Sequence, residues 1–170
     1  MVPKRILIID DDANLRRTVS DILRAKGYLP LPAATGRAGL RTAQEFQPAA
    51  ALIDLRMEDL SGTDVLQRIK ECSPETECIV LTGHASQTSA IEAMNLGAYS
   101  YLQKPYDVDQ LLMTIRRAIE RQDDRRALRE SEERYRRFFR TSQDCVFIVS
   151  RDWRWLDLNS AAVNLFRYDD

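Results

Sequence analysis

Short apolar runs alternate with amphipathic stretches between residues 6 and 119. The apolar runs predict strands at 6–9, 28–33, 50–53, 78–81 and 99–103. Helices are expected between them, because apolar residues recur at the spacing of one helical face, as at Leu15, Val19, Ile22 and Leu23. These helices should cover 13–26, 36–46, 63–71 and 86–96, with a fifth beginning at Asp107. Strict alternation of strands and helices predicts a parallel sheet with helices on both faces.

The second predicted strand contains Pro30 and Pro32. Because proline cannot donate a hydrogen bond to a sheet ladder, this strand should lie at an edge of the sheet. A strand order of 2-1-3-4-5 places it there. We therefore expect a doubly wound, flavodoxin-like α/β domain built on a five-stranded parallel sheet.

The composition of the chain changes after residue 119. Most residues from 120 to 140 are charged, and the stretch contains neither glycine nor proline. We expect the fifth helix to run without a break toward Phe139, since these residues are mostly good helix formers. The 3-4-3 spacing of a helical seam is followed by Leu128, Ser131, Tyr135 and Phe138. This stripe predicts a homodimer through the helix at 107–140; the alternative is a single solvated helix.

The last part of the chain has a pattern of its own. Strands are expected at 145–149 and 155–158, followed by a short helix at 160–166. This stretch is too short to build an independent core. The expected organisation is a first domain at 1–121, a helical linker at 122–140, and the N-terminal fragment of a second domain at 141–170.

Composition narrows the class of protein. The 170 residues carry a formal net charge of -1, and 44% are hydrophobic and 30% charged, as in soluble globular proteins. With so small a net charge, the chain has no overall electrostatic field that would attract nucleic acid. No apolar run approaches the roughly 20 residues of a membrane span. Three scattered cysteines, Cys72, Cys78 and Cys145, indicate neither a disulfide framework nor a zinc site. We expect a cytoplasmic protein with reduced thiols that contacts no membrane and, in this part, no nucleic acid.

Polar side chains follow four of the predicted strands, at Asp10–Asp12, Asp54, Thr82 and Lys104. In an open parallel sheet, ligands bind beyond the carboxyl ends of the strands, where the strand order reverses. Taken one at a time, these residues have ordinary explanations, because acidic runs form solvated loops and a single Asp often forms a turn. Their occurrence together at the ends of the strands points to one shared site.

The chemistry of these residue types favours phosphoryl transfer. Clustered carboxylates repel each other unless a cation joins them, and Mg²⁺ prefers oxygen ligands of this kind. A carboxylate beside such an ion can act as a nucleophile toward phosphorus, while a lysine neutralises the oxygens of the transferred group. A threonine hydroxyl can hydrogen-bond the arriving phosphoryl group.

Residues 4 to about 121 resemble a response-regulator receiver domain of two-component signalling. The matching motifs are ILIIDD at 6–11, ALID at 51–54, Met57, Gly62, LTGH at 81–84 and GAYSYLQKP at 97–105. The resemblance implies that Asp54 is the phosphoacceptor. It also implies that Mg²⁺ binds Asp10, Asp11 and Asp54, with the backbone carbonyl of Arg56 as a further ligand. Where the family usually has a proline after the methionine, this chain has Glu58, which puts the rigidity of that loop in question.

The resemblance further implies a switch and a phosphodonor. Thr82 and Lys104 are expected to contact the phosphoryl group, and Tyr101 to turn when it arrives. The expected donor is a sensor histidine kinase or a phosphotransfer protein. The only histidine, His84, lies between Gly83 and Ala85 and not in an acidic helical box, so we interpret it as a loop residue. A receiver is not an enzyme beyond its own phosphorylation and dephosphorylation.

Two other functions are compatible with the same residues. A metal-dependent phosphohydrolase usually carries a second Asp two residues after its nucleophile, but this chain has Arg56 there. A phosphorylation-independent interaction and dimerisation module typically lacks the acceptor, the acidic pair or the lysine, all of which are present.

The C-terminal part resembles the opening of a PAS sensor domain with its lead-in helix. The matching residues are 128–136, 138–139, 144–149, 155–162 and 165–168. The turn of that family often has Asp-Gly where this chain has Asp152-Trp153. The resemblance implies a partial α+β PAS segment and a PAS-containing output.

Overall fold

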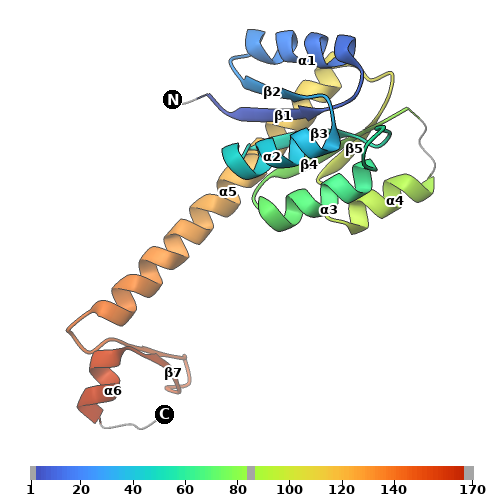
Figure 1. Ribbon diagram of the computed structural model, residues 1–170. Coiled ribbons are helices and arrows are strands. Elements are labelled where there is room, and N and C mark those ends of the chain that lie inside the picture. The colour runs from blue at the N-terminus through green and yellow to red at the C-terminus, as the bar shows by residue number, and fades with distance from the viewer. Residues whose placement is uncertain (1–2, 84–86, 167–170) are drawn as a thin grey trace. The chain divides into compact units, whose positions relative to one another are not determined.

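The computed structural model describes residues 3–83 and 87–166 (Figure 1). The chain divides into two compact units, residues 1–123 and 124–170. His84 and the predicted start of the fourth helix at Ser86 lie outside the described residues, as do the last matching residues of the C-terminal segment at 167 and 168.

The first unit is built on a five-stranded parallel sheet in the order β2-β1-β3-β4-β5. Its strands are β1 (Arg5–Ile9), β2 (Leu29–Ala33), β3 (Ala50–Asp54), β4 (Glu77–Thr82) and β5 (Ser100–Gln103). The predicted doubly wound fold and strand order are confirmed. The proline-containing β2 is at the edge and pairs only with β1, as its two missing donors require.

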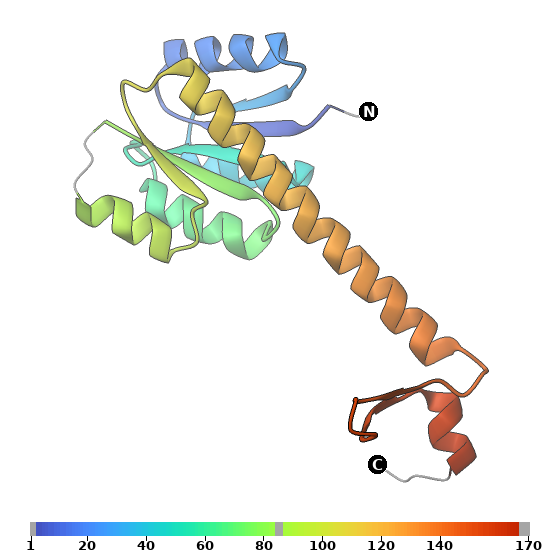
Figure 2. The same cartoon turned by 180° about the vertical axis from the view of Figure 1, so that it is seen from behind.

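Helices cover both faces of this sheet (Figures 1 and 2). They are α1 (Ala13–Ala25), α2 (Gly36–Phe46), α3 (Gly62–Cys72), α4 (Gln87–Asn95) and α5 (Val108–Thr141). Helices α1 and α5 pack on one face, while α2, α3 and α4 pack on the other. The connections after β1 and β3 turn to opposite faces of the sheet. The carboxyl ends of these two strands are therefore where an open parallel sheet binds its ligands.

Two apolar cores lie on the two sides of the sheet. Alternate residues of β1 serve them: Ile6 and Ile8 face α1 and α5, whereas Leu7 and Ile9 face the opposite helices. All four side chains are fully buried. Burial on both faces explains why β1 reads as one continuous apolar run and not as an alternating pattern.

Helix α5 is 34 residues long, which confirms the predicted long C-terminal helix. Its first turns bury Leu111, Ile115 and Ala118 in the core shared with α1. At the end of the first unit, Arg121 pairs with the buried Glu77 at 3.7 Å and lies over the ring of Tyr99. These contacts fix α5 against the sheet up to the boundary of the first unit.

The second unit contains a small antiparallel hairpin, β6 (Phe147–Val149) with β7 (Trp155–Leu158), followed by α6 (Ser160–Phe166). The buried Asn159 organises it, accepting hydrogen bonds from the Val146 and Ala162 N–H groups at 3.0 Å and donating to the Asp144 carbonyl. Trp153 in the turn has a φ of 59°, the left-handed region that favours glycine. The predicted strand at 145–149 is shorter than expected, because residues 145 and 146 lie outside the hairpin ladder.

Candidate functional site

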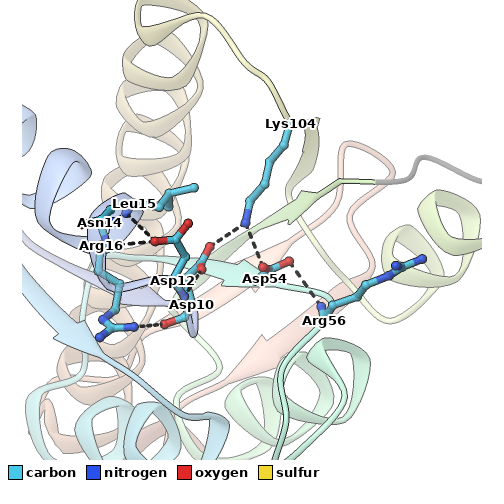
Figure 3. Close-up of polar contacts among 8 residues, drawn as sticks. All are labelled: Asp10, Asp12, Asn14, Leu15, Arg16, Asp54, Arg56 and Lys104. Carbon is cyan, nitrogen blue, oxygen red and sulfur yellow. Dashed lines mark hydrogen bonds and ion pairs between the residues drawn. The ribbon is translucent and has the colours of Figure 1, made fainter.

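The candidate site lies where β1 and β3 end side by side. Ile9 pairs with Ile53 across the ladder, so the next residue on each strand, Asp10 and Asp54, emerges at the same edge. Both carboxylates are buried, Asp10 completely and Asp54 with 7% of its surface exposed. Figure 3 shows the two side chains directed toward one another.

Asp11 completes an acidic cluster with these two residues. One carboxylate oxygen from each of Asp10, Asp11 and Asp54 lies within 4.8 Å of the others. Asp11 is exposed, so the cluster is open to solvent on one side. This donor set suits a small hard cation such as Mg²⁺, which takes few carboxylates and keeps several waters. The three aspartates predicted to hold the ion are therefore brought together.

Asp12, the third member of the acidic run, has a structural role. Its carboxylate caps α1 by accepting hydrogen bonds from the N–H groups of Asn14 at 2.8 Å and Leu15 at 3.2 Å. The main chain of Asp10 is held from the same helix, since the Arg16 guanidinium donates to the Asp10 carbonyl at 2.6 Å (Figure 3). These contacts fix the β1–α1 turn that carries Asp10 and Asp11.

Lys104 bridges the two buried carboxylates. Its Nζ atom lies 2.7 Å from Asp10 Oδ2 and 2.8 Å from Asp54 Oδ2. Burial alone would lower the pKa of this ammonium, but the hydrogen bonds and charges of Asp10 and Asp54 outweigh it and raise the pKa above its usual value. Lys104 therefore stays protonated at neutral pH, with its charge between the two aspartates.

The main chain places Lys104 next to the end of β4. The Lys104 N–H donates to the Thr82 carbonyl at 2.7 Å, so β5 delivers the lysine beside the predicted switch threonine. Thr82 itself is buried at the last position of β4. Thr82, Lys104 and Asp54 thus come from three adjacent strand ends of one sheet.

Tyr101 lies on the edge strand β5, with 42% of its surface exposed. Its neighbour Leu102 is buried in the core shared with α1 and α5, so alternation along the strand puts Tyr101 on the face covered by α4. The structure thus separates Tyr101 from the buried group of Asp10, Asp54 and Lys104.

The loop after Asp54 turns back toward the acceptor. The Arg56 N–H donates to Asp54 Oδ1 at 3.3 Å, while the Arg56 side chain points away from the site (Figure 3). The Gly62 N–H closes the loop on the Leu55 carbonyl at 3.0 Å. It is therefore the backbone of Arg56, and not its guanidinium, that adjoins the acidic cluster.

Gly62 is required by close contact in this loop. A Cβ atom at this position would lie 2.3 Å from the Asp54 carbonyl oxygen, which is rigid backbone. We expect Gly62→Ala to lower the free energy of unfolding by about 1–3 kcal/mol, the usual cost of overpacking. Urea denaturation measures this change. Gly83→Ala is the matched control, since its added Cβ meets nothing within 4 Å; equal stability of the two variants would contradict the contact.

Asp59 is the residue of this region that sequence reasoning missed. Its carboxylate accepts hydrogen bonds from the Gly36 N–H at 2.8 Å and the Arg37 N–H at 3.0 Å, at the start of α2. Its partners lie 23 and 22 residues away in the chain, so no local pattern connects them.

The strand order, the acidic cluster and the bridging lysine define a receiver-type α/β domain. Residues 6–116 match the family model described as a response regulator receiver domain, and the chain belongs to this family. The Escherichia coli regulatory protein AtoC is 33% identical over 125 residues, which are 74% of this chain and 27% of AtoC. The chain thus spans about a quarter of that relative's length.

Solved structures show the same similarity. A CheY-like receiver domain protein from Methanospirillum hungatei superposes with a TM-score of 0.70 at 32% identity, covering 72% of this chain and 98% of that one. The beryllofluoride-activated NtrC4 receiver domain dimer gives 0.66 at 36% identity, covering 69% and 98%. Among the helices of the described residues, none is long and apolar enough to cross a membrane.

Proposed function

We propose that this chain is the phosphoacceptor of a two-component phosphorelay, in which Asp54 takes a phosphoryl group from a sensor histidine kinase or a phosphotransfer protein. The observation that carries the proposal is the position of the Lys104 ammonium, 2.7 and 2.8 Å from two aspartates that form an acidic cluster with a third. This arrangement supplies a nucleophile, a fixed positive charge and a set of oxygen ligands at one edge of the sheet.

Each residue has a part in the transfer. An oxygen of Asp54 attacks phosphorus, the P–N bond to the donor histidine breaks, and an acyl phosphate forms on the carboxylate. Lys104 keeps its charge. Its ammonium then pairs with an oxygen of the phosphoryl group instead of with the free Asp54 carboxylate. Asp10, Asp11 and the Arg56 carbonyl would hold Mg²⁺ beside Asp54. When bound, the ion supplies further neutralisation of the phosphoryl oxygens.

The side chain two residues after Asp54 supports storage of the phosphoryl group and not repeated hydrolysis. A phosphohydrolase usually carries a second Asp there as acid or base, and this chain has Arg56, which points away from Asp54 (Figure 3). We therefore propose that the domain catalyses nothing beyond its own phosphorylation and dephosphorylation.

We propose that Thr82 and Tyr101 pass the change at Asp54 to the surface of the domain. Thr82 is buried beside Lys104, and Tyr101 is half exposed on β5. Residues 1–121 would form the receiver, 122–140 a signalling helix, and 141–170 the start of a PAS domain in the output. The β6–β7 hairpin followed by α6 supports this reading of the C-terminal part.

An intact-mass measurement tests the proposed function. The full chain is incubated with Mg²⁺ and acetyl phosphate, a small-molecule donor that needs no kinase. A gain of one phosphoryl group that lasts for minutes supports the receiver. Consumption of acetyl phosphate without an adduct would indicate a phosphohydrolase, and no change would indicate a phosphorylation-independent module.

Dimerisation through α5 is a separate prediction. Leu128, Tyr135 and Phe138 are between 53% and 65% exposed on a helix that is otherwise highly charged. A polar helix of this length is rarely stable alone, and burial of this stripe against a second copy would stabilise it. The beryllofluoride-activated NtrC4 receiver domain, to which this chain is similar, forms a dimer.

Light scattering at tens of micromolar should therefore show a dimer for residues 1–170 and a monomer for a chain ending at Arg121. Replacing Leu128 and Phe138 by Gln in the full chain should have the same effect as the truncation. If the full chain is a monomer with and without phosphorylation, the segment is a solvated linker.

A further inference from the structure

The loop between β3 and α3 is tied to the start of α2 by one side chain, Asp59. Helix α2 leaves its first N–H groups without partners in the helix. Its N-cap Thr35 accepts only from the Ala38 N–H, at 3.2 Å. Asp59 supplies acceptors for the remaining donors of the first turn, those of Gly36 and Arg37.

The electrostatics and packing of Asp59 agree with a fixed position. The Arg37 N–H lowers the pKa of the Asp59 carboxyl against an opposing effect of burial, and the Gly36 N–H adds to the lowering. The next residue packs on the same turn of α2, because a Cβ at Gly36 would lie 3.0 Å from Leu60 Cβ. The absence of a side chain at Gly36 thus lets the loop lie directly against the helix.

The same loop carries the backbone that adjoins the acidic cluster. Its near end is held by the Arg56 N–H on Asp54 and by the Leu55 N–H on the Leu81 carbonyl at 3.1 Å. Among the described residues 57–60, the hydrogen bonds of Asp59 are those that reach another element of the fold. Glu58, unlike a proline, leaves its own φ angle free. Asp59 therefore restrains the loop on the far side of the Arg56 carbonyl, in addition to the packing of Met57 and Leu60 against the core.

We propose that Asp59 is a positioning residue for the cation site: by holding the β3–α3 loop on α2, it fixes the Arg56 carbonyl relative to Asp10, Asp11 and Asp54. The proposal rests on the proposed function of the site, since it takes Mg²⁺ as the ion and the Arg56 carbonyl as a ligand. Asp59 itself does not touch the ion or the phosphoryl group. Its loss should leave all ligands present but less well ordered.

The test uses the full 170-residue chain and compares Asp59→Ala with three other variants. Asp59→Asn keeps one acceptor oxygen. Thr35→Ala weakens the same helix end without touching the loop. Glu58→Gln removes one negative charge from the same loop while leaving the Asp59 hydrogen bonds in place. The first readout is the Mg²⁺ concentration that gives half of the Mg²⁺-dependent rise in melting temperature, and the second is the rate of phosphorylation by acetyl phosphate.

We expect Asp59→Ala to raise the half-saturating Mg²⁺ concentration about tenfold, at the low end of the effects seen for residues that orient metal ligands. The half-saturating Mg²⁺ concentration of Asp59→Asn should lie between those of Asp59→Ala and the wild type. Thr35→Ala should lower the melting temperature without moving the Mg²⁺ midpoint. The loss of a negative charge alone also weakens cation binding. The rise in the half-saturating Mg²⁺ concentration must therefore be larger for Asp59→Ala than for Glu58→Gln.

The proposal would be overturned if Asp59→Ala raised the half-saturating Mg²⁺ concentration no more than Glu58→Gln does. It would also be overturned if Thr35→Ala raised that concentration as much as Asp59→Ala does. If Asp59→Ala does not fold, the comparison of Asp59→Asn with Glu58→Gln decides in the same way, because each removes one charge. Failure of the wild type to become phosphorylated would count against the proposed function alone, since the Mg²⁺ midpoint is measured without a phosphodonor.

Discussion

Asp54→Asn is expected to abolish phosphorylation by acetyl phosphate and to leave the fold intact. Asparagine has the shape of aspartate and keeps an oxygen that can accept the hydrogen bond from Lys104, now at 2.8 Å from Asp54. Its amide cannot form an acyl phosphate, so the loss of the adduct should be complete. Intact mass reports the adduct, and circular dichroism with thermal melting reports the fold.

A matched carboxylate on the same domain provides the control. Asp21 is exposed on α1 and pairs with Arg24 at 2.9 Å. Asp21→Asn should gain the phosphoryl group at the wild-type rate. If Asp54→Asn gains it at that rate as well, the acceptor is a different residue and the site assignment is wrong.

The second large effect concerns the cation. Mg²⁺ should raise the melting temperature of the wild type, because it relieves repulsion among Asp10, Asp11 and Asp54 and binds only the native state. At a free Mg²⁺ concentration tenfold above Kd, the gain in unfolding free energy is about 1.4 kcal/mol. The double variant Asp10→Asn with Asp11→Asn should lose this gain, because two of the three clustered carboxylates are then neutral.

Differential scanning fluorimetry measures this effect, with NaCl at matched ionic strength as the control for screening. The wild type should respond to Mg²⁺ and not to NaCl. If the melting temperature of the double variant rises with Mg²⁺ as much as that of the wild type, the ion binds elsewhere on the chain.

Most of the sheet could be predicted because both of its faces are buried. Strands such as 6–9 and 50–53 read as unbroken apolar runs, and the prolines of the second strand marked the edge. The prediction started β4 at residue 78, one residue late, because its first residue is the charged Glu77. That carboxylate is buried next to Arg121 and Lys70, which are 44 and 7 residues away in the chain. No local sequence pattern predicts such partners.

The site was predictable for a related reason. Parallel strands bring their carboxyl ends to one edge, so polar residues directly after the strands had to meet there, and Asp10, Asp54 and Lys104 do. Asp12 belonged to the same acidic run, but its carboxylate caps α1. Asp59 could not be singled out, because its contacts depend on how α2 lies beside the loop.

The central claim is that a phosphoryl group is transferred to Asp54, and chemical trapping tests it most directly. Borohydride reduces an aspartyl phosphate to homoserine, so the acceptor can be located by fragmenting the peptides of the trapped protein. After incubation with acetyl phosphate and Mg²⁺, homoserine should be found at position 54, and it should be absent when Mg²⁺ is chelated. Homoserine at position 10, 11 or 12, or its absence throughout the digest of a protein that has gained the phosphoryl mass, would contradict the account.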